Sequence, residues 1–271
     1  MKNQPIGFMD SGVGGLSVVK EVIKLLPNEQ LYFIGDSARN PYGSRSMAEV
    51  LEFSKELADF LISKNIKLLV IACNTATVAA LEVLQKELDI PVIGVIEPGS
   101  KSAIKNTKND TIGVIATEGT VKSDEYNKKI KEINQSAEIQ SVACQSFVTI
   151  VEENKLDSKE TRKAVAECLK AFEDFKMDTL VLGCTHFPLL ESYIQNYFGD
   201  EVLLIDPGVE TASLVQQYLI ENNLINDNNT QPKKHIFYTT GSAEKFKKIA
   251  INWLKNENFK VESVSLKELV E

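Results

Sequence analysis

Short apolar runs alternate with amphipathic helical patterns along the whole chain, and this alternation most constrains how it can fold. Strands that alternate with helices are typical of a mostly parallel sheet with helices on both faces. The predicted fold class is therefore α/β. Strands are expected at residues 6–9, 31–34, 68–72, 92–96, 111–116, 139–142, 179–182, 202–205, 235–239 and 261–264.

The helical patterns between these runs predict eight helices, and two of their starts have the spacing of a capping box. Ser46 precedes Glu49 by three residues, and Asp157 precedes Glu160 by three. The stretch 222–234, with five Asn and one Pro, is predicted to be a surface loop. Helices are expected at 16–26, 47–63, 76–88, 123–133, 159–175, 189–197, 209–221 and 243–254.

The chain also resembles itself at a nearly constant spacing. Two apolar runs each end in a small residue, a cysteine and polar residues, and two acidic residues each precede Pro-Gly. A third, weaker pair of segments begins with glycine. Offsets of 111, 109 and 106 residues predict two similar α/β halves, although apolar strands that end in polar loops are common. The pairs are Cys73 and Cys184, Pro98 and Pro207, and segments 7–10 and 113–116.

Composition excludes several classes of protein. Of the 271 residues, 43% are hydrophobic and 25% charged, which is ordinary for a globular protein. A formal charge of −8 argues against a broad nucleic-acid surface. No apolar run approaches the ~20 residues of a membrane span. The start lacks the layout of a secretory signal, so the expected location is the cytoplasm, with no membrane or nucleic-acid partner.

The four cysteines are expected to be thiols in such a reducing compartment. The chain has no Cys-x-x-Cys pair, and His186 and His235 are its only histidines, so no Cys/His metal site is predicted. Cys144 and Cys168 lack a strand-end setting, and Cys168 is interpreted as a core residue of a helix.

Ligands of open parallel sheets bind outside the carboxyl ends of the strands. The polar residues that follow the predicted strands are therefore the candidates for function. Thr75 and Thr185 are expected near helix starts, where free N–H groups bind carboxylates and favour a thiolate. The candidates are Asp10, Ser11, Asp36, Ser37, Cys73, Asn74, Thr75, Thr117, Cys184, Thr185 and His186.

Cys73 and Cys184 suit the inversion of a stereocentre. This reaction needs a base on one face of Cα and an acid on the other, and the two exchange protonation states during turnover. A thiol, with an ordinary pKa near 8.5, can serve in either role after modest tuning. One such cysteine alone would be interpreted as a small core residue, but two in duplicated positions favour function.

The glycine-rich segment 10–15 and His186 have alternative interpretations. Asp10-Ser11-Gly12-Val13-Gly14-Gly15 does not match Gly-x-Gly-x-x-Gly, which disfavours a dinucleotide site. In one interpretation, the segment exposes N–H groups to a ligand carboxylate, and Asp10 is a charged residue behind these groups. In the other, the segment is only a tight turn between a strand and a helix. His186 is interpreted as tuning Cys184, whereas His235 has no such neighbour.

These residues together resemble the glutamate racemase family, with the wider aspartate/glutamate racemases as its relatives. The resemblance covers most of the chain and is thinnest after Gly241. The matching motifs are Asp10-Ser11-Gly12-Val13-Gly14-Gly15-Leu16, Gly35-Asp36, Pro41-Tyr42-Gly43, Cys73-Asn74-Thr75-Ala76 and Gly183-Cys184-Thr185-His186-Phe187-Pro188.

The resemblance implies interconversion of L- and D-glutamate without pyridoxal phosphate or metal, supplying D-glutamate for peptidoglycan, cell wall and cell shape. It implies that Cys73 acts on D-glutamate with Asp10 as assistant, and that Cys184 acts on L-glutamate with His186. Glu152 and Asp36 match further acidic positions. Implied substrate contacts are Asp10, Ser11, Tyr42, Gly43, Asn74, Thr75, Thr117, Thr185 and His186.

The family fold implies two α/β domains with the site between them, and a homodimer. The predicted domains are residues 1–97 with 208–271, and residues 98–207, so the chain crosses near Pro98 and Pro207. Four alternatives remain open at this point: an aspartate racemase, a hydantoin racemase, a solute-binding protein and a dinucleotide-dependent enzyme. One methylene of substrate is worth only ~1–3 kcal/mol of discrimination, so physics alone does not choose between glutamate and aspartate.

Overall fold

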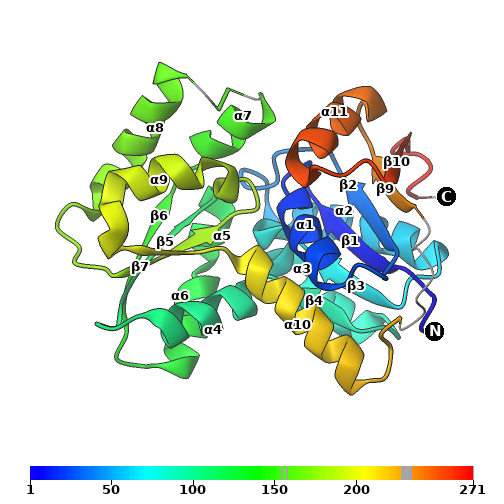
Figure 1. Cartoon of the computed structure of the whole chain (residues 1–271), viewed down its shortest axis with the longest axis horizontal. Coiled ribbons are helices and arrows are strands. Elements are labelled where there is room, and N and C mark those ends of the chain that lie inside the picture. Colours follow the sequence, from blue (N-terminus) through cyan, green and yellow to red (C-terminus); the bar gives the residue numbers. More distant parts are fainter. Residues whose placement is uncertain (154, 157, 227–233, 271) are drawn as a thin grey trace.

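The computed structural model describes residues 1–153, 155–156, 158–226 and 234–270, which form two α/β lobes (Figure 1). The larger lobe contains a six-stranded sheet in the order β10-β9-β2-β1-β3-β4, and all of its neighbouring strands are parallel. Its strands are β1 Ile6–Asp10, β2 Leu31–Gly35, β3 Leu68–Ile71, β4 Val92–Gly94, β9 His235–Thr239 and β10 Phe259–Ser263.

The smaller lobe contains a four-stranded parallel sheet in the order β6-β5-β7-β8. This order matches β2-β1-β3-β4 of the larger sheet strand for strand, so β5 corresponds to β1 and β7 to β3. The predicted α/β class and internal repeat are therefore confirmed, and all ten strands lie within a few residues of their expected positions. The strands are β5 Thr111–Ala116, β6 Glu138–Ala143, β7 Thr179–Gly183 and β8 Leu203–Ile205.

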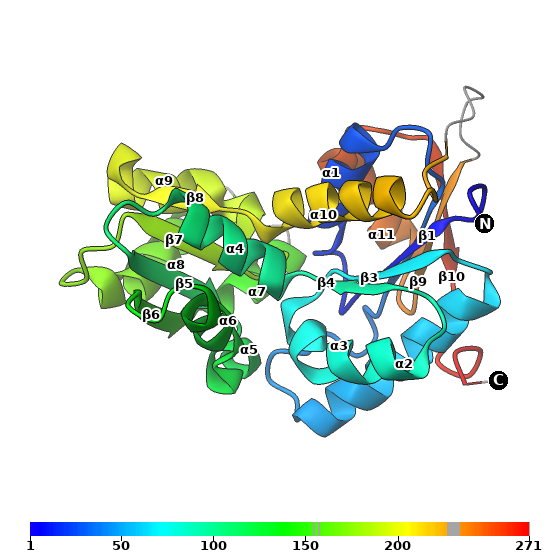
Figure 2. The same ribbon diagram turned by 90° about the horizontal axis from the view of Figure 1, so that it is seen from below.

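Helices cover both faces of each sheet. Two helices, α4 and α10, each follow a strand of one lobe and pack on the other lobe. After β4 in the larger lobe, α4 packs on α6 and β7 of the smaller one; after β8, α10 returns to pack on α1 (Figure 2). The α-helices are α1 Leu16–Leu25, α2 Met47–Ser63, α3 Asn74–Glu87, α4 Ile96–Asn106, α5 Glu118–Ser123, α6 Glu125–Ile133, α7 Ser146–Glu152, α8 Lys159–Leu169, α9 Glu191–Phe198, α10 Pro207–Glu221 and α11 Ala243–Leu254.

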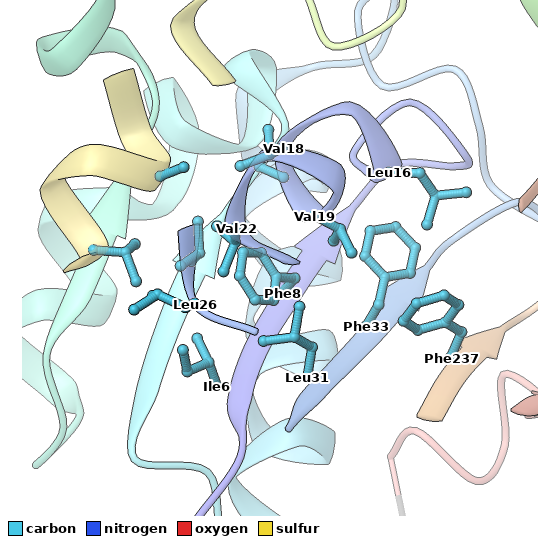
Figure 3. Close-up of a cluster of buried hydrophobic side chains, with 14 of the residues drawn as sticks. Ile6, Phe8, Leu16, Val18, Val19, Val22, Leu26, Leu31, Phe33 and Phe237 are labelled. Atoms are coloured by element: carbon cyan, nitrogen blue, oxygen red, sulfur yellow. The ribbon is translucent and has the colours of Figure 1, made fainter. Parts of the chain in front are cut away.

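Apolar side chains fill the space between each sheet face and its helices. In the larger lobe, Phe8 and Phe33 point toward Val19 and Val22 of α1, and Phe237 extends this layer (Figure 3). All five are completely buried, and full burial of such a side chain contributes about 1.5–3 kcal/mol. This packing holds the carboxyl ends of β1, β2 and β3 in fixed relative positions.

Several helices differ from the prediction for physical reasons. Helix α4 was not predicted: residues 92–96 were expected to form a strand and Pro98 to mark a crossing between the domains, but proline is tolerated in the first turn of a helix. The short helix α7 was also missed. The helix predicted at 123–133 is α6, which begins after Asp124 in the left-handed conformation (φ 62°), and the short helix α5 before it was not predicted. The helix predicted to end at 175 ends at Leu169 and continues as a 3₁₀ turn.

The two predicted helix caps have different outcomes. The Ser46 and Glu49 capping box is present, with both reciprocal hydrogen bonds. Helix α8 is instead capped by Ser158, whose hydroxyl accepts from the Thr161 N–H. Asp157 lies outside the described residues, as does the 227–233 part of the predicted surface loop 222–234.

The expectation of four free thiols is wrong for one pair. Cys144, which follows β6, is joined by a disulfide to Cys168 of α8. Cys73 and Cys184 are free and buried. The interpretation of Cys168 as an isolated core thiol is thereby corrected, because its sulfur links α8 to the start of α7.

Candidate active site

A buried cavity lies where the carboxyl ends of the two sheets face each other, and both free cysteines line it. Its free volume of about 10 Å³ is the space of a single water molecule. The residues that line it come from both lobes. They are Ser11, Asn40, Pro41, Tyr42, Gly43, Cys73, Asn74, Thr75, Thr117, Val148, Cys184, Thr185 and His186.

Cys73 follows β3 and caps the start of α3, where its Sγ accepts a hydrogen bond from the Ala76 N–H at 3.5 Å. Its thiol also donates to the Ser11 hydroxyl at 3.8 Å. Burial, reinforced by the negative charge of Asp10, raises the pKa of Cys73 to about 12. Cys73 is therefore a protonated thiol near neutral pH and is suited to give a proton.

Asp10 ends β1 and links the two lobes. One carboxylate oxygen accepts from the Gly12 N–H at 3.0 Å, and the other accepts from the Thr185 hydroxyl at 3.2 Å. Burial raises the pKa of Asp10, against the opposing effect of the positive charge on His186. Thr185 belongs to the smaller lobe, so this bond connects the surroundings of the two cysteines.

Cys184 follows β7, and a short chain of polar contacts extends from its sulfur. Its Sγ lies 3.6 Å from Nδ1 of His186, whose Nε2 lies 2.7 Å from a carboxylate oxygen of Glu152. Burial lowers the pKa of His186, but its hydrogen bonds to Cys184 and Glu152 outweigh burial and hold that pKa well above its usual value. The resulting imidazolium places a positive charge beside the Cys184 sulfur.

Glu152 balances this positive charge. Burial acts to raise the pKa of its carboxyl, but the hydrogen bond and charge of His186 prevail and lower it. The carboxylate also receives hydrogen bonds from the Val13 N–H and the Asn40 side chain. The site is thus asymmetric: a neutral thiol lies beside Asp10, and a Cys–His–Glu chain lies opposite.

The glycine-rich turn after β1 lies against the smaller lobe. A Cβ atom on Gly14 would lie 2.4 Å from the Thr185 hydroxyl and 2.6 Å from the His186 ring. A Cβ on Gly12 would lie 2.6 Å from a Glu152 oxygen. Glycine is thus required because the backbone approaches the Cys184 side closely, so the turn serves the contact between the lobes.

Neutral hydroxyl groups from both lobes also meet at the cavity. Thr75 of α3 lies 2.9 Å from Thr117 and 3.3 Å from Thr120, measured between hydroxyl oxygens. Thr117 caps α5, and Thr120 lies in its first turn. Thr75 is the second residue of α3, as expected for a position near a helix start, whereas Thr185 precedes only a 3₁₀ turn, Phe187–Leu190.

Asp36 lies behind Tyr42 and is fully buried. Its carboxylate accepts from the Tyr42 hydroxyl at 2.5 Å, from Nε of Arg39 at 2.6 Å and from the Thr240 hydroxyl at 2.8 Å. Burial, reinforced by the charge of Asp36, raises the pKa of Tyr42 far above its usual range. Tyr42 therefore faces the cavity as a neutral phenol that Asp36 holds in place.

Ser37, which was also a candidate, does not line the cavity and accepts a hydrogen bond from the Thr239 hydroxyl at 3.2 Å. Of the remaining predicted site residues, ten line the cavity. The other three are the carboxylates, and each lies behind a lining residue: Asp10 behind Thr185, Glu152 behind His186 and Asp36 behind Tyr42. Sequence reasoning missed Asn40, Pro41 and Val148 as lining residues. Val148 lies on α7, a helix too short to be predicted from its periodicity, and nothing in the sequence distinguishes Asn40.

Among the described residues, no three His, Cys, Asp or Glu side chains gather so that they could hold a metal ion. None of the helices described is both long and apolar enough to cross a membrane.

Comparison with known proteins identifies the family. Residues 6–215 match the model of the Asp/Glu/Hydantoin racemase family. A glutamate racemase of Carnobacterium sp. (strain St2) is 52% identical over 267 residues, covering 98% of this chain and all of that protein. One from Pediococcus pentosaceus is 53% identical over 266 residues, with the same coverage.

Solved structures agree with the sequence comparison. A glutamate racemase isoform of Bacillus anthracis superimposes with a TM-score of 0.94 at 44% identity, covering 98% of this chain and 99% of that one. The enzyme of Francisella tularensis, solved in complex with D-glutamate, gives a TM-score of 0.91 at 36% identity with the same coverage. From the cavity with its two duplicated cysteines, the family match and the full-length relatives, we conclude that this chain is an isomerase of the aspartate/glutamate racemase family.

Proposed function

We propose that the protein converts L-glutamate to D-glutamate, without pyridoxal phosphate or metal, by a two-cysteine acid/base mechanism. The observation that carries the proposal is that Cys73 and Cys184, from equivalent positions of the two lobes, line the same buried cavity. Curated relatives over the full length are named glutamate racemases, and one related structure holds D-glutamate.

The lining of the cavity supports a carboxylate substrate. Hydroxyl and amide donors come from Ser11, Asn74, Thr75 and Thr117, and no described Lys or Arg is among the lining residues. The start of α3 contributes N–H groups, which favour an anion there. Neutral donors and a helix N-terminus can hold glutamate without a strong positive field that would bind other anions.

In the direction from L to D, the Cys184 thiolate removes the Cα proton and becomes a thiol. The electron pair left on Cα delocalises into the α-carboxylate, and the Cys73 thiol gives its proton to the opposite face, which leaves a thiolate. The asymmetry of the site suits this direction, because burial and Asp10 raise the pKa of Cys73 and keep the proton on its thiol, while the His186 imidazolium lies beside the Cys184 sulfur. For D-glutamate the roles are reversed.

Substrate entry requires the lobes to move apart, because a cavity of about 10 Å³ does not hold glutamate. The interlobe contacts Asp10–Thr185 and Thr75–Thr117 would break and re-form in each cycle. Closure would then exclude water from the carbanion-like intermediate. We propose the domains to be residues 1–97 with 208–271, and residues 98–207, a division that agrees with the exchange of α4 and α10 between lobes.

The family also includes enzymes for aspartate and hydantoins, by the description of its model. The test is therefore a comparison of substrates. Purified protein, treated with EDTA and given no cofactor, would be incubated separately with L-glutamate, L-aspartate and a 5-substituted hydantoin, and optical rotation followed. Loss of rotation with glutamate at a kcat/KM at least tenfold above that for aspartate supports the proposal, and a preference for either other substrate rejects it.

The wider role is part of the same proposal. D-glutamate would supply peptidoglycan synthesis and so cell-wall formation and cell shape, and the enzyme would act as a homodimer in the cytoplasm. These points rest on the family resemblance alone. Deletion of the gene, with growth rescued by external D-glutamate, tests the supply role.

A further inference from the structure

Asn74 is the first residue of α3 and follows Cys73 directly. Its side chain is buried, lines the cavity and accepts a hydrogen bond at Oδ1 from the hydroxyl of Tyr126, with the two oxygens 2.7 Å apart. Its amide nitrogen, Nδ2, has no hydrogen-bond partner among the described residues. One end of the Asn74 amide is therefore engaged, and the other is free to meet a ligand.

Tyr126 comes from the opposite lobe. It lies in the first turn of α6, is 2% exposed and packs in the apolar layer that contains Ile112, Ile130 and Val181. Its ring lies against the end of β7: a Cβ atom on Gly183 would be 2.9 Å from the ring edge. Gly183 immediately precedes Cys184, so the absence of a side chain there lets the phenol reach across to Asn74.

The direction of this hydrogen bond determines which end of the amide faces the cavity. An asparagine side chain presents an acceptor at one end and two donors at the other, and its partner selects the orientation. Burial keeps the Tyr126 phenol protonated by raising its pKa well above the ordinary value, so its hydroxyl can donate to Oδ1. A carboxylate only accepts hydrogen bonds, so a ligand carboxylate needs Nδ2.

We propose that Tyr126 is a positioning residue for substrate binding: its hydroxyl holds Oδ1 of Asn74 so that Nδ2 is presented to a substrate carboxylate. Because the two residues belong to different lobes, the correct orientation of Asn74 is fixed only when the lobes close. This inference rests on the proposed racemisation of glutamate and assigns one residue of the smaller lobe to that site.

The first test is Tyr126→Phe, which removes the hydroxyl and keeps the ring. We expect the KM for L-glutamate to rise about tenfold, the effect of losing one hydrogen bond to a charged ligand, with less than a threefold change in kcat. Tyr238→Phe is the matched control, since Tyr238 is also largely buried but packs against Phe60, and neither of these residues lines the cavity. A wild-type KM in Tyr126→Phe overturns the proposal.

A double-mutant cycle tests whether Tyr126 acts through Asn74. In an Asn74→Ala background, Tyr126→Phe is expected to raise KM by less than twofold further. A tenfold further rise would show that Tyr126 acts independently, and the proposal would be rejected. If Tyr126 had only a structural role, Tyr126→Phe would lower the unfolding temperature both in the wild type and in the Asn74→Ala background. Its effect on KM would then be the same in the two backgrounds.

Asn74→Asp tests the orientation without altering Tyr126. The aspartate keeps an acceptor for the phenol but presents a second oxygen to the substrate, so KM should rise more than in Asn74→Ala. A KM in Asn74→Asp at or below that of Asn74→Ala contradicts the proposal. If the wild-type protein racemises glutamate and these variants behave otherwise, the role of Tyr126 alone fails. If the wild type is inactive with glutamate, the proposed function fails and this inference with it.

Discussion

Nδ1 of His186 lies 3.6 Å from Sγ of Cys184, and the far nitrogen of the same ring contacts Glu152. The ring is completely enclosed, yet its pKa lies well above the usual value because both neighbours stabilise the imidazolium. A positive charge is thus held beside the cysteine that we propose acts on L-glutamate, and among the described residues no equivalent lies beside Cys73.

Glu152→Gln should move the alkaline limb of the pH profile to lower pH. The substitution removes the negative charge of Glu152, which helps to raise the pKa of His186, so the ring loses its proton, and the site its positive charge beside Cys184, at lower pH. The measurement is kcat/KM for L-glutamate against pH. Glu153→Gln, which alters an exposed neighbour paired with Lys155, should leave the limb unchanged. An alkaline limb at the wild-type position in Glu152→Gln would refute the role of Glu152.

The raised pKa of His186 also predicts how the stability of the fold depends on pH. A histidine whose pKa is higher in the folded state adds stability below its unfolded value of about 6.5, and this contribution is lost as pH rises through the folded pKa. The stability advantage of the wild type over His186→Asn should therefore be largest below about pH 6.5 and shrink above it. Urea unfolding at several pH values measures this, and an advantage that grows with pH would contradict it.

Gly14→Ala should damage the site more than the fold. The new methyl group would lie 2.4 Å from the Thr185 hydroxyl and 2.6 Å from the His186 ring, so the Cys184 side must shift. A displacement of this size costs about 10²-fold in kcat/KM. Gly199→Ala is the contrasting variant, since its φ of 69° adds about 1–2 kcal/mol of strain while no atom lies within 4 Å of the added carbon. We expect Gly199→Ala to lower stability with unchanged kcat/KM; equal kinetic losses in both variants would argue against close approach at Gly14.

Lys67→Met should destabilise the protein without impairing the site. Lys67 is completely buried and donates to Glu29 at 2.6 Å and to the carbonyl oxygens of Lys2 and Leu224. It precedes β3, at the end of the strand remote from Cys73. Removing it leaves the buried Glu29 carboxylate unpaired, which costs about 3–5 kcal/mol.

The matched control is Lys55→Met, which breaks the exposed Lys55–Glu87 pair and should cost at most about 1 kcal/mol. Urea unfolding gives the free energies, and kcat/KM below the unfolding transition should be unchanged in both variants. Equal stabilities of the two variants would mean that the buried pair contributes no more than a surface pair.

The strands, and the places of Cys73 and Cys184 after two of them, could be predicted because both depend on local pattern, whereas the Cys144–Cys168 disulfide was not predicted. Each strand is a short apolar run bounded by polar residues, and Cys73 and Cys184 follow two of these runs at a repeat spacing. Contacts between residues far apart in the chain could not be predicted from the sequence. The Asp36–Tyr42 bond and the position of each carboxylate behind a lining residue depend on how loops fold back.

Interlobe contacts were also beyond sequence reasoning. Tyr126 and Asn74 are 52 residues apart, and nothing in either segment marks the other. Helix α4 was hidden by Pro98 and Gly99, and the seven residues of α7 give less than two full turns of periodicity. Gly14 was recognised as part of a turn, but its closeness to His186 appears only when the lobes are brought together.

The most direct test of the two-cysteine mechanism is incubation with L-glutamate in D2O, with analysis of both enantiomers before 10% conversion. If separate groups remove and return the proton, D-glutamate should carry deuterium at Cα while the remaining L-glutamate stays protonated. Cys73→Ala and Cys184→Ala should each lower racemisation by about 10²–10⁴-fold or more. Equal early deuterium in both enantiomers, or a single-cysteine variant that keeps most of its activity, would contradict the mechanism.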